Sequence, residues 1–188
     1  MAVIVGTNQF RNGMHIELDG GVWRIVEFQH VKPGKGGAFV RTKLKNVRTG
    51  SVVDRTYRAD EKLEQAIIDK REMQYLYRDG EHYVFMDKEN YEQLTLEADF
   101  LEGQAGYLLP NSDVQINFYN GRAIGVEIPP SVILTVVDTE PGIKNATATN
   151  TFKPATMETG ITVQVPPFIN KGERIKVDTA EGTYMERA

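Results

Sequence analysis

The chain has 188 residues, with 26 acidic and 22 basic side chains, three histidines and no cysteine. The absence of cysteine excludes disulfide bonds, cysteine-ligated metal sites and a thiol nucleophile, and no apolar run approaches the ~18 residues that span a bilayer. The length suits one medium-sized domain or two to three small ones. We expect a folded cytoplasmic protein that has no signal peptide and does not bind a membrane.

Hydrophobic residues recur mostly with a period of two, which is typical of strands. In the first third, Val22 to Val26 is rich in β-branched and aromatic residues. In the middle third, Tyr75 to Met86 contains the turn Asp79-Gly80, and Val114 to Ile128 contains Asn120-Gly121. Such dipeptides supply the positive φ of tight hairpins. Many short strands joined by such turns predict an all-β chain.

Two segments of the middle third predict helices instead. Glu89 to Leu96 could form a short helix, with Asp87 as the N-cap acceptor. Glu97 to Leu109 is a weaker candidate, because Gly103 and Gly106 interrupt it.

The last third contains a strand-like run that ends at two prolines. Val163, Val165 and Phe168 are interpreted as strand core, and Pro166-Pro167 marks the end of a strand or a bulge. We expect this run to be structural, because no chemistry is visible there.

Charge divides the chain into three parts. Residues 1–65 carry a net charge of +4, residues 66–128 of −7 and residues 129–188 of −1. The sign changes between residues 64 and 70, and Pro129-Pro130 interrupts the chain further on. We therefore predict three domains with the boundaries 1–65, 66–128 and 129–188. Tandem small barrels are commonly SH3-like or oligonucleotide-binding (OB) folds.

No catalytic, metal-binding or cofactor-binding motif is present in the sequence. His15, His30 and His82 lack metal-ligand spacing, and no serine lies in a Gly-x-Ser-x-Gly element. No phosphate-binding glycine loop follows a strand. The acidic cluster that includes Glu89 and Glu92 predicts a solvated face, with a hydrolytic carboxylate pair as the alternative. We expect no catalytic residue, metal or cofactor.

The segment His30 to Val40, HVKPGKGGAFV, is the most informative. Pro33 restricts the entry to a loop, and Gly34 and Gly36 remove side-chain bulk on both sides of Lys35. This pattern predicts an exposed lysine that can enter a narrow cleft and meet a phosphate or a hydroxyl. A flexible hairpin with a solvated lysine is the alternative.

A basic strand follows this loop. Arg41, Lys43 and Lys45 alternate with uncharged residues, so one face carries three positive charges. Like charges on one face destabilise a sheet unless a polyanion neutralises them, and Arg48, Arg55 and Arg58 extend the patch. The pattern predicts nucleic-acid binding that weakens as salt is added.

Over its whole length the chain resembles the bacterial translation elongation factor P family. Residues 30–39 match the lysine-bearing loop of that family, and residues 75–86, 92–94 and 139–142 also agree. The C-terminal family signature is matched at Lys153, Ala155, Gly160, Ile161, Val163, Pro166, Ile169 and Gly172.

The resemblance implies three small β-barrels in an L shape, an N-terminal SH3/KOW-like barrel and two OB-folds. It implies a non-enzymatic, monomeric translation elongation factor that binds the 70S ribosome between the P and E sites. There the Lys35 loop would stabilise the P-site peptidyl-tRNA and promote peptide-bond formation at consecutive prolines.

The resemblance also implies roles for individual residues. Lys35 matches a lysine that a modifying enzyme can extend with a β-lysyl or an aminopentanol group. Asn145, Ala146 and Thr147 occupy the loop matched to E-site codon contact, where Ala146 departs from the common Gly-Asp-Thr pattern. The positions that match tRNA or ribosomal RNA contacts are Lys32, Pro33, Gly34, Lys35, Gly36, Arg41, Tyr184 and Arg187.

Two other classes of function remain open at this point. One is a general RNA-binding or RNA-chaperone module, which would need no special role for Lys35. The other is a hydrolase that uses the acidic cluster. The acidic middle third is expected to face solvent or a basic protein rather than RNA.

Overall fold

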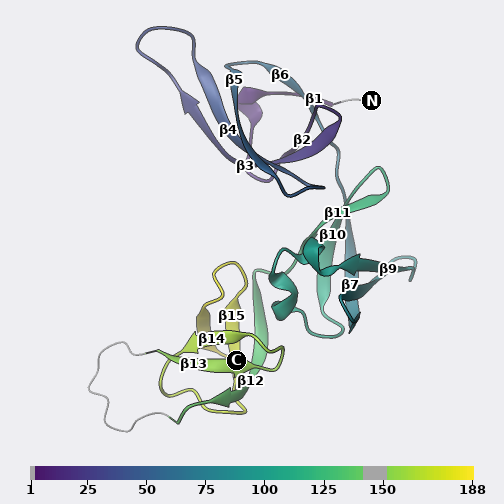
Figure 1. Ribbon diagram of the computed structural model, residues 1–188, viewed down its shortest axis with the longest axis vertical. Helices are drawn as coiled ribbons and strands as arrows, with labels where there is room; N and C mark the ends of the chain where they lie inside the picture. Colours follow the sequence, from purple (N-terminus) through teal and green to yellow (C-terminus); the bar gives the residue numbers. More distant parts are fainter. Residues whose placement is uncertain (1–2, 142–151) are drawn as a thin grey trace. The chain divides into compact units, whose positions relative to one another are not determined.

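The computed structural model describes residues 3–141 and 152–188, and these residues form an all-β protein (Figure 1). Sixteen strands and three short 3₁₀ helices lie within the described ranges, so the all-β prediction is confirmed. The chain divides into two compact units, Met1–Lys70 with Asn117–Gly125, and Arg71–Ile116 with Val126–Ala188. The boundaries 1–65, 66–128 and 129–188 stay a prediction.

The first sheet contains six strands that curl around one apolar core. The order is β1-β6-β2-β3-β4-β5, and the single-turn helix η1 (Thr7–Gln9) follows β1. The strands are β1 (Val3–Gly6), β2 (His15–Leu18), β3 (Gly21–Val31), β4 (Phe39–Asn46), β5 (Val52–Arg58) and β6 (Lys62–Gln65). The buried core consists of Val5, Phe10, Ile16, Ile25, Val40, Leu44 and Tyr57.

The second sheet has the order β11-β10-β7-β8-β9. Its strands are β7 (Asp69–Asp79), β8 (His82–Asp87), β9 (Gln93–Glu97), β10 (Asp113–Tyr119) and β11 (Arg122–Glu127). Both predicted hairpins are confirmed. Asp79 pairs with His82 across the first turn, and Asn120 and Gly121 both adopt positive φ, 48° and 76°, in the second. Within the first unit, the Tyr119 hydroxyl donates a hydrogen bond to the Glu17 carboxylate.

The predicted helix Glu89 to Leu96 is wrong. The Asp87 carboxylate does accept hydrogen bonds from the backbone N–H groups of Glu89 (2.8 Å) and Asn90 (3.4 Å), as an N-cap would. The chain then turns through Tyr91, whose φ is 62°, and enters β9 instead. Pairing of β9 with β8 buries Leu96, and this tertiary gain outweighs local helix propensity.

The weaker candidate Glu97 to Leu109 forms no α-helix either. It contains two short 3₁₀ helices, η2 (Ala98–Leu101) and η3 (Gln104–Tyr107). Glu102 and Gly103, with φ of 46° and 84°, separate the two helices. Of the two glycines expected to interrupt the helix, Gly103 therefore lies at the break, whereas Gly106 lies within η3.

The third sheet has the order β14-β13-β12-β15-β16. Its strands are β12 (Ser131–Thr139), β13 (Lys153–Met157), β14 (Thr162–Val165), β15 (Arg174–Asp178) and β16 (Tyr184–Arg187). The core consists of Leu134, Val136, Ala155, Met157, Val163, Val165, Ile169, Ile175 and Val177. Tyr107 from η3 and Leu109 after it pack against this core, which ties η3 to the third sheet within the second unit.

Among the helices of the described residues, none has the length and apolarity needed to cross a membrane.

Candidate nucleic-acid interface

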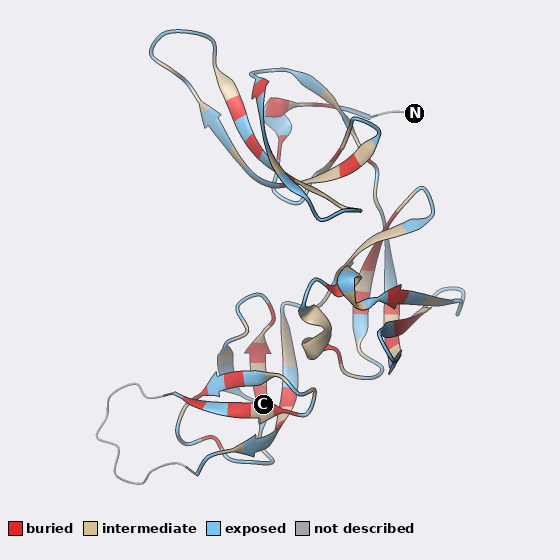
Figure 2. Ribbon diagram, viewed as in Figure 1, coloured by how far each residue is buried: buried red, intermediate tan, exposed pale blue. Residues whose placement is uncertain are grey.

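The lysine loop is the tip of the β3–β4 hairpin, which extends away from the first sheet (Figure 1). Val31 pairs with Phe39 as the last rung of this hairpin, and residues 32–38 form the connecting loop. Lys35 is exposed, as are Lys32, Gly34, Gly36 and Gly37, whereas the paired strands below are partly buried (Figure 2). Among the described residues, the Lys35 side chain has no hydrogen-bond or ion-pair partner.

The glycines around Lys35 border open space. A β-carbon built on Gly34, Gly36 or Gly37 would meet no atom within 4 Å. Gly36 also has φ of 104°, a conformation that side chains with a β-carbon rarely adopt. The arrangement leaves the Lys35 ammonium group at the end of a thin hairpin, free of neighbouring bulk.

Behind the tip, exposed and buried side chains alternate along β4, as expected from its sequence. Arg41 and Lys43 are exposed, while Val40, Thr42 and Leu44 are buried on the opposite face. The Thr42 hydroxyl donates to the Arg55 carbonyl at 2.9 Å, which satisfies a buried polar group without involving the outward face.

The positive charges of this region are partly neutralised within the chain, which the sequence did not indicate. Lys43 forms an ion pair with Glu27 on β3 (3.6 Å) and pairs in register with Asp54 on β5. Arg55 pairs with Asp19 at 3.0 Å. The expectation that a polyanion is needed to neutralise the patch therefore does not hold for Lys43 and Arg55.

Arg41 differs from Lys43 and Arg55, because it has no ion-pair partner among the described residues. Its guanidinium lies 5.5 Å from the centre of the Phe39 ring, and no carboxylate in the described part of the chain pairs with it. A stacked guanidinium keeps its N–H donors available and is held in one orientation. Arg41 is therefore the side chain of β4 best placed to bind an external anion.

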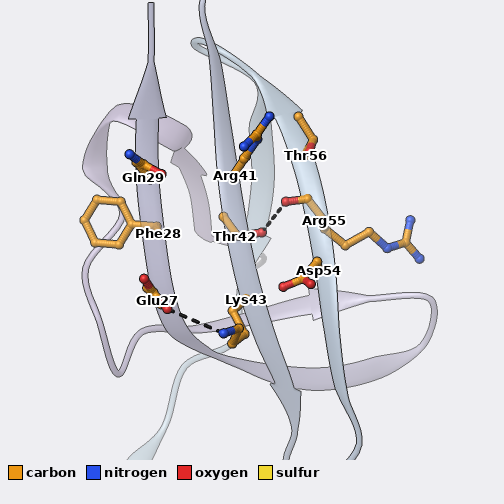
Figure 3. A pocket seen from close by; sticks show the side chains of 9 residues that line it. All are labelled: Glu27, Phe28, Gln29, Arg41, Thr42, Lys43, Asp54, Arg55 and Thr56. Carbon is orange, nitrogen blue, oxygen red and sulfur yellow. Dashed lines mark hydrogen bonds and ion pairs between the residues drawn. The ribbon is translucent and has the colours of Figure 1, made fainter.

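A shallow groove of about 370 Å³ crosses the outward face of β3, β4 and β5 (Figure 3). The sequence did not single out the uncharged and acidic residues of this groove, because they become neighbours only through strand register. The lining residues are Glu27, Phe28, Gln29, Arg41, Thr42, Lys43, Asp54, Arg55 and Thr56.

The sheet beneath the groove contains an unusual tyrosine. Tyr57 is 6% exposed and its ring meets Phe10 edge-on at 6.1 Å. Its hydroxyl is buried without a hydrogen-bond partner in the described residues. Burial raises the pKa of Tyr57 above its ordinary value of 10.0, and Arg55 opposes this rise.

Tyr184 and Arg187, the predicted contacts of the last third, both lie on β16 in the second unit. Tyr184 is half-buried against the third core. The Arg187 guanidinium donates to the Phe168 carbonyl (3.1 Å), pairs with Glu173 (3.4 Å) and lies 4.7 Å from the centre of the Phe168 ring. Both residues thus make contacts within the third barrel.

The prediction of strand core before Gly172 is confirmed for Val163 and Val165 and wrong for Phe168. Val163 and Val165 are at most 1% exposed, whereas Phe168 is 55% exposed. The double proline ends β14 at Val165, so Phe168 falls in the following turn and stacks on Arg187 instead.

The predicted codon-contacting loop Asn145-Ala146-Thr147 lies outside the described residues.

No group of three or more potential metal ligands occurs within residues 3–141 and 152–188.

The chain is an all-β protein built from SH3/KOW-like and OB-type barrels. Three family models match consecutive parts of the chain. These are "Elongation factor P (EF-P) KOW-like domain" (residues 6–63), "Elongation factor P (EF-P) OB domain" (68–126) and "Elongation factor P, C-terminal" (132–187).

Curated relatives agree with these matches. The chain is 53% identical over 188 residues to elongation factor P of Nitrosospira multiformis, covering 100% of both chains. It is 55% identical over 185 residues to elongation factor P of Moorella thermoacetica, covering 98% of this chain and 100% of the relative. The chain belongs to the elongation factor P family and is a translation elongation factor.

A solved structure extends the likeness to another translation factor. Eukaryotic translation initiation factor 5A from Methanococcus jannaschii matches with a TM-score of 0.51 and 27% identity. The match covers 66% of this chain and 96% of that one.

Proposed function

We propose that this chain binds the 70S ribosome between the P and E sites and holds the P-site peptidyl-tRNA through the Lys35 loop. In this position it promotes peptide-bond formation at consecutive prolines. The observation that carries the proposal is the exposed Lys35, which has no described partner and lies between glycines that border open space. Membership of the elongation factor P family supplies the context.

The mechanism is positional rather than chemical. Proline is a poor donor and acceptor because its ring restricts the geometry of attack. A hairpin tip that reaches the CCA end of the tRNA reduces the motion of the reactive end, and correct orientation alone can lower a barrier substantially. The ribosome performs the bond formation, and the factor itself supplies no catalytic residue.

The other contacts follow from charge and exposure. Lys32 and Arg41 would bind phosphates of tRNA or ribosomal RNA beside the tip, with Pro33, Gly34 and Gly36 allowing close approach. Tyr184 and Arg187 would shape the surface of the third barrel that faces the tRNA. The middle region, with a net charge of −7 over residues 66–128, would face solvent or a basic protein. The protein would act in the cytoplasm as a monomer of three barrels.

The decisive test compares proline-rich and proline-poor reporters in reconstituted translation. Lys35→Ala should slow synthesis through Pro-Pro-Pro by roughly 10- to 100-fold and leave a proline-poor reporter nearly unchanged. Lys62→Ala is the matched control, because Lys62 is an exposed lysine on β6 of the same sheet. Equal loss on both reporters would contradict the mechanism. Full activity of Lys35→Ala with comparable affinity for unstructured RNA would favour a general RNA-binding module instead.

We propose further that Lys35 is enzymatically extended, because its open surroundings give a modifying enzyme access to the ammonium group. A longer arm would increase the reach of the hairpin and could add hydrogen-bond donors for RNA. Intact-mass measurement of protein from its native host should show the added mass on a Lys35-containing peptide. Fully active protein of unmodified mass would rule out an obligatory extension.

A further inference from the structure

The outward face of β3, β4 and β5 is organised as rungs that cross the three strands. Next to the hairpin tip, Val31 pairs with Phe39. The next outward rung contains Gln29, Arg41 and Thr56, here called the polar row, because Arg41 pairs in register with both of the other residues. The rung after that contains Glu27, Lys43 and Asp54, here called the acidic row. Figure 3 shows the polar row and the acidic row at two levels of the same groove, with Phe28, Thr42 and Arg55 between them.

The polar row combines one available cation with two neutral hydrogen-bonding groups. Gln29, Arg41 and Thr56 are all exposed. The Arg41 guanidinium is held by the Phe39 ring and has no carboxylate partner within the described residues. An amide and a hydroxyl therefore flank a cation, which matches a phosphate with a neighbouring sugar hydroxyl.

The acidic row has the opposite balance. Its two carboxylates flank one ammonium group, so its net charge is −1, and Lys43 is already paired with Glu27 at 3.6 Å. A phosphate placed on this row would meet two carboxylates and a cation that is already engaged. Repulsion between the phosphate and the two carboxylates opposes binding. The groove is thus favourable to a polyanion at the tip side and unfavourable on the next rung.

We infer that the polar row binds one sugar–phosphate unit of RNA and that the acidic row stops the RNA backbone from running further along the barrel. Arg41 binds the phosphate oxygens, and Thr56 and Gln29 hydrogen-bond to the ribose 2′-hydroxyl. The inference rests on the proposed function for the presence of RNA at the hairpin. It adds the path of the backbone across this face and a preference for RNA over DNA.

The ribose contact follows from the neutral members of the row. A site that only attracts phosphate needs cations, and lysine or arginine at positions 29 and 56 would serve it better. An amide and a hydroxyl instead add both donors and acceptors beside the guanidinium, and the 2′-hydroxyl is both a donor and an acceptor. DNA lacks that hydroxyl, so these two contacts distinguish the nucleic acids.

The test titrates the full-length isotope-labelled protein with an RNA hairpin that ends in single-stranded CCA, and with the DNA of the same sequence. Amide chemical shifts report both the position of binding and the dissociation constant, at several salt concentrations. Wild-type protein should shift at the hairpin and the polar row and should bind the RNA more tightly than the DNA. Gln29→Leu with Thr56→Val should weaken RNA binding several-fold, leave DNA binding unchanged and so remove the preference.

Charge variants test the two rows separately. Arg41→Ala should weaken binding of both probes and reduce the salt slope by about one. Arg55→Ala is the matched control, because it removes the same charge from the neighbouring strand, and the Arg55 guanidinium is already paired with Asp19 at 3.0 Å. Glu27→Gln with Asp54→Asn should steepen the salt slope and extend the shifted amides past the acidic row.

Three outcomes would overturn the inference. One is equal weakening of RNA and DNA by Gln29→Leu with Thr56→Val. Another is an equal cost of Arg55→Ala and Arg41→Ala, and the third is the absence of polar-row shifts at saturating RNA. None of these outcomes affects the Lys35→Ala reporter result, so the inference can fail while the proposed function stands. A normal Pro-Pro-Pro rate for Lys35→Ala would contradict the proposed function alone.

Discussion

Two regions of this protein use glycine and lysine for opposite purposes. In the β3–β4 hairpin, Gly34 and Gly37 border open space and Lys35 is exposed without a described partner. In the second unit, a β-carbon on Gly106 of η3 would overlap the Cγ2 methyl of Ile161. There, Lys153 is 8% exposed and its ammonium group donates to the Glu140 carbonyl.

The contrast shows that the residue type alone does not reveal its purpose. Glycine provides clearance in both regions, but for an external molecule at the hairpin and for a neighbouring side chain at η3. The charge of Lys35 is exposed to solvent, whereas the ammonium group of buried Lys153 donates a hydrogen bond within the fold. Substitutions in the β3–β4 hairpin should therefore lower activity and leave stability unchanged. Substitutions at Gly106 or Lys153 should lower stability.

The largest effect on stability is expected from Gly106→Ala. The added methyl must displace Ile161, which packs against the third core, and overpacking of this kind costs about 2–3 kcal/mol. Thermal unfolding should show a fall in Tm of roughly 5–10 °C.

A double-mutant cycle identifies the cause of the Gly106→Ala effect. Ile161→Leu removes the β-branch while keeping the side-chain volume, so Gly106→Ala should cost much less in that background. Gly37→Ala is the matched comparison from the hairpin, where no neighbouring atom lies within 4 Å of the added methyl. A destabilisation of Gly37→Ala as large as that of Gly106→Ala would break the contrast.

A smaller loss is expected from Lys153→Met. Methionine keeps an apolar stem in the buried site but leaves the Glu140 carbonyl without its donor, at a cost of about 1–2 kcal/mol. Urea unfolding should detect this as a lower midpoint with an unchanged slope. Lys35→Met should leave the midpoint where it is, and similar midpoints for the two variants would contradict the assignment of different roles.

Much of this contrast was open to prediction from sequence, and the rest depends on tertiary pairing. Turn dipeptides located two hairpins, and the Pro-Gly-Lys-Gly pattern indicated an exposed lysine. The sequence did not predict the close contact between Gly106 and Ile161, because Ile161 is 55 residues further along the chain.

Strand register explains the other misses. A bulge between Ile25 and Glu27 shifts β3 against β4, and only after this shift does Glu27 pair with Lys43. No local pattern marks that bulge, so the neutralised charges could not be anticipated. The helix expected at residues 89–96 failed for a similar reason, since pairing with β8 decided the conformation.

A small gain in stability is expected from Tyr57→Phe, on β5 beside Val40 of the hairpin. The change removes a buried hydroxyl that has no partner among the described residues and keeps the edge-on contact with Phe10, so stability should rise by up to about 1 kcal/mol. Chemical unfolding at neutral pH measures this gain. A loss instead would mean that the hydroxyl is hydrogen-bonded in solution.

The same substitution should alter the alkaline limb of the stability curve. Burial raises the folded pKa of Tyr57 above 10.0, so the unfolded chain ionises first. The stability linked to this residue is complete below pH 10 and is lost as the pH rises through the folded pKa. Tyr57→Phe should make this decline shallower, and the raised pKa values of Tyr75 and Tyr119 should preserve part of it.

The hairpin itself should show almost no effect of added bulk on stability. Neither Gly34 nor Gly37 has a positive φ, so both can become valine without backbone strain. Gly34→Val with Gly37→Val retains Lys35 but thickens the tip.

The most direct test of the central claim, that Lys35 acts through a tip thin enough to enter a narrow cleft, is the rate of Pro-Pro-Pro synthesis with this double valine variant. We predict an unchanged Tm and a rate close to that of Lys35→Ala, about 10- to 100-fold below wild type. A wild-type rate with the thickened hairpin would contradict the account.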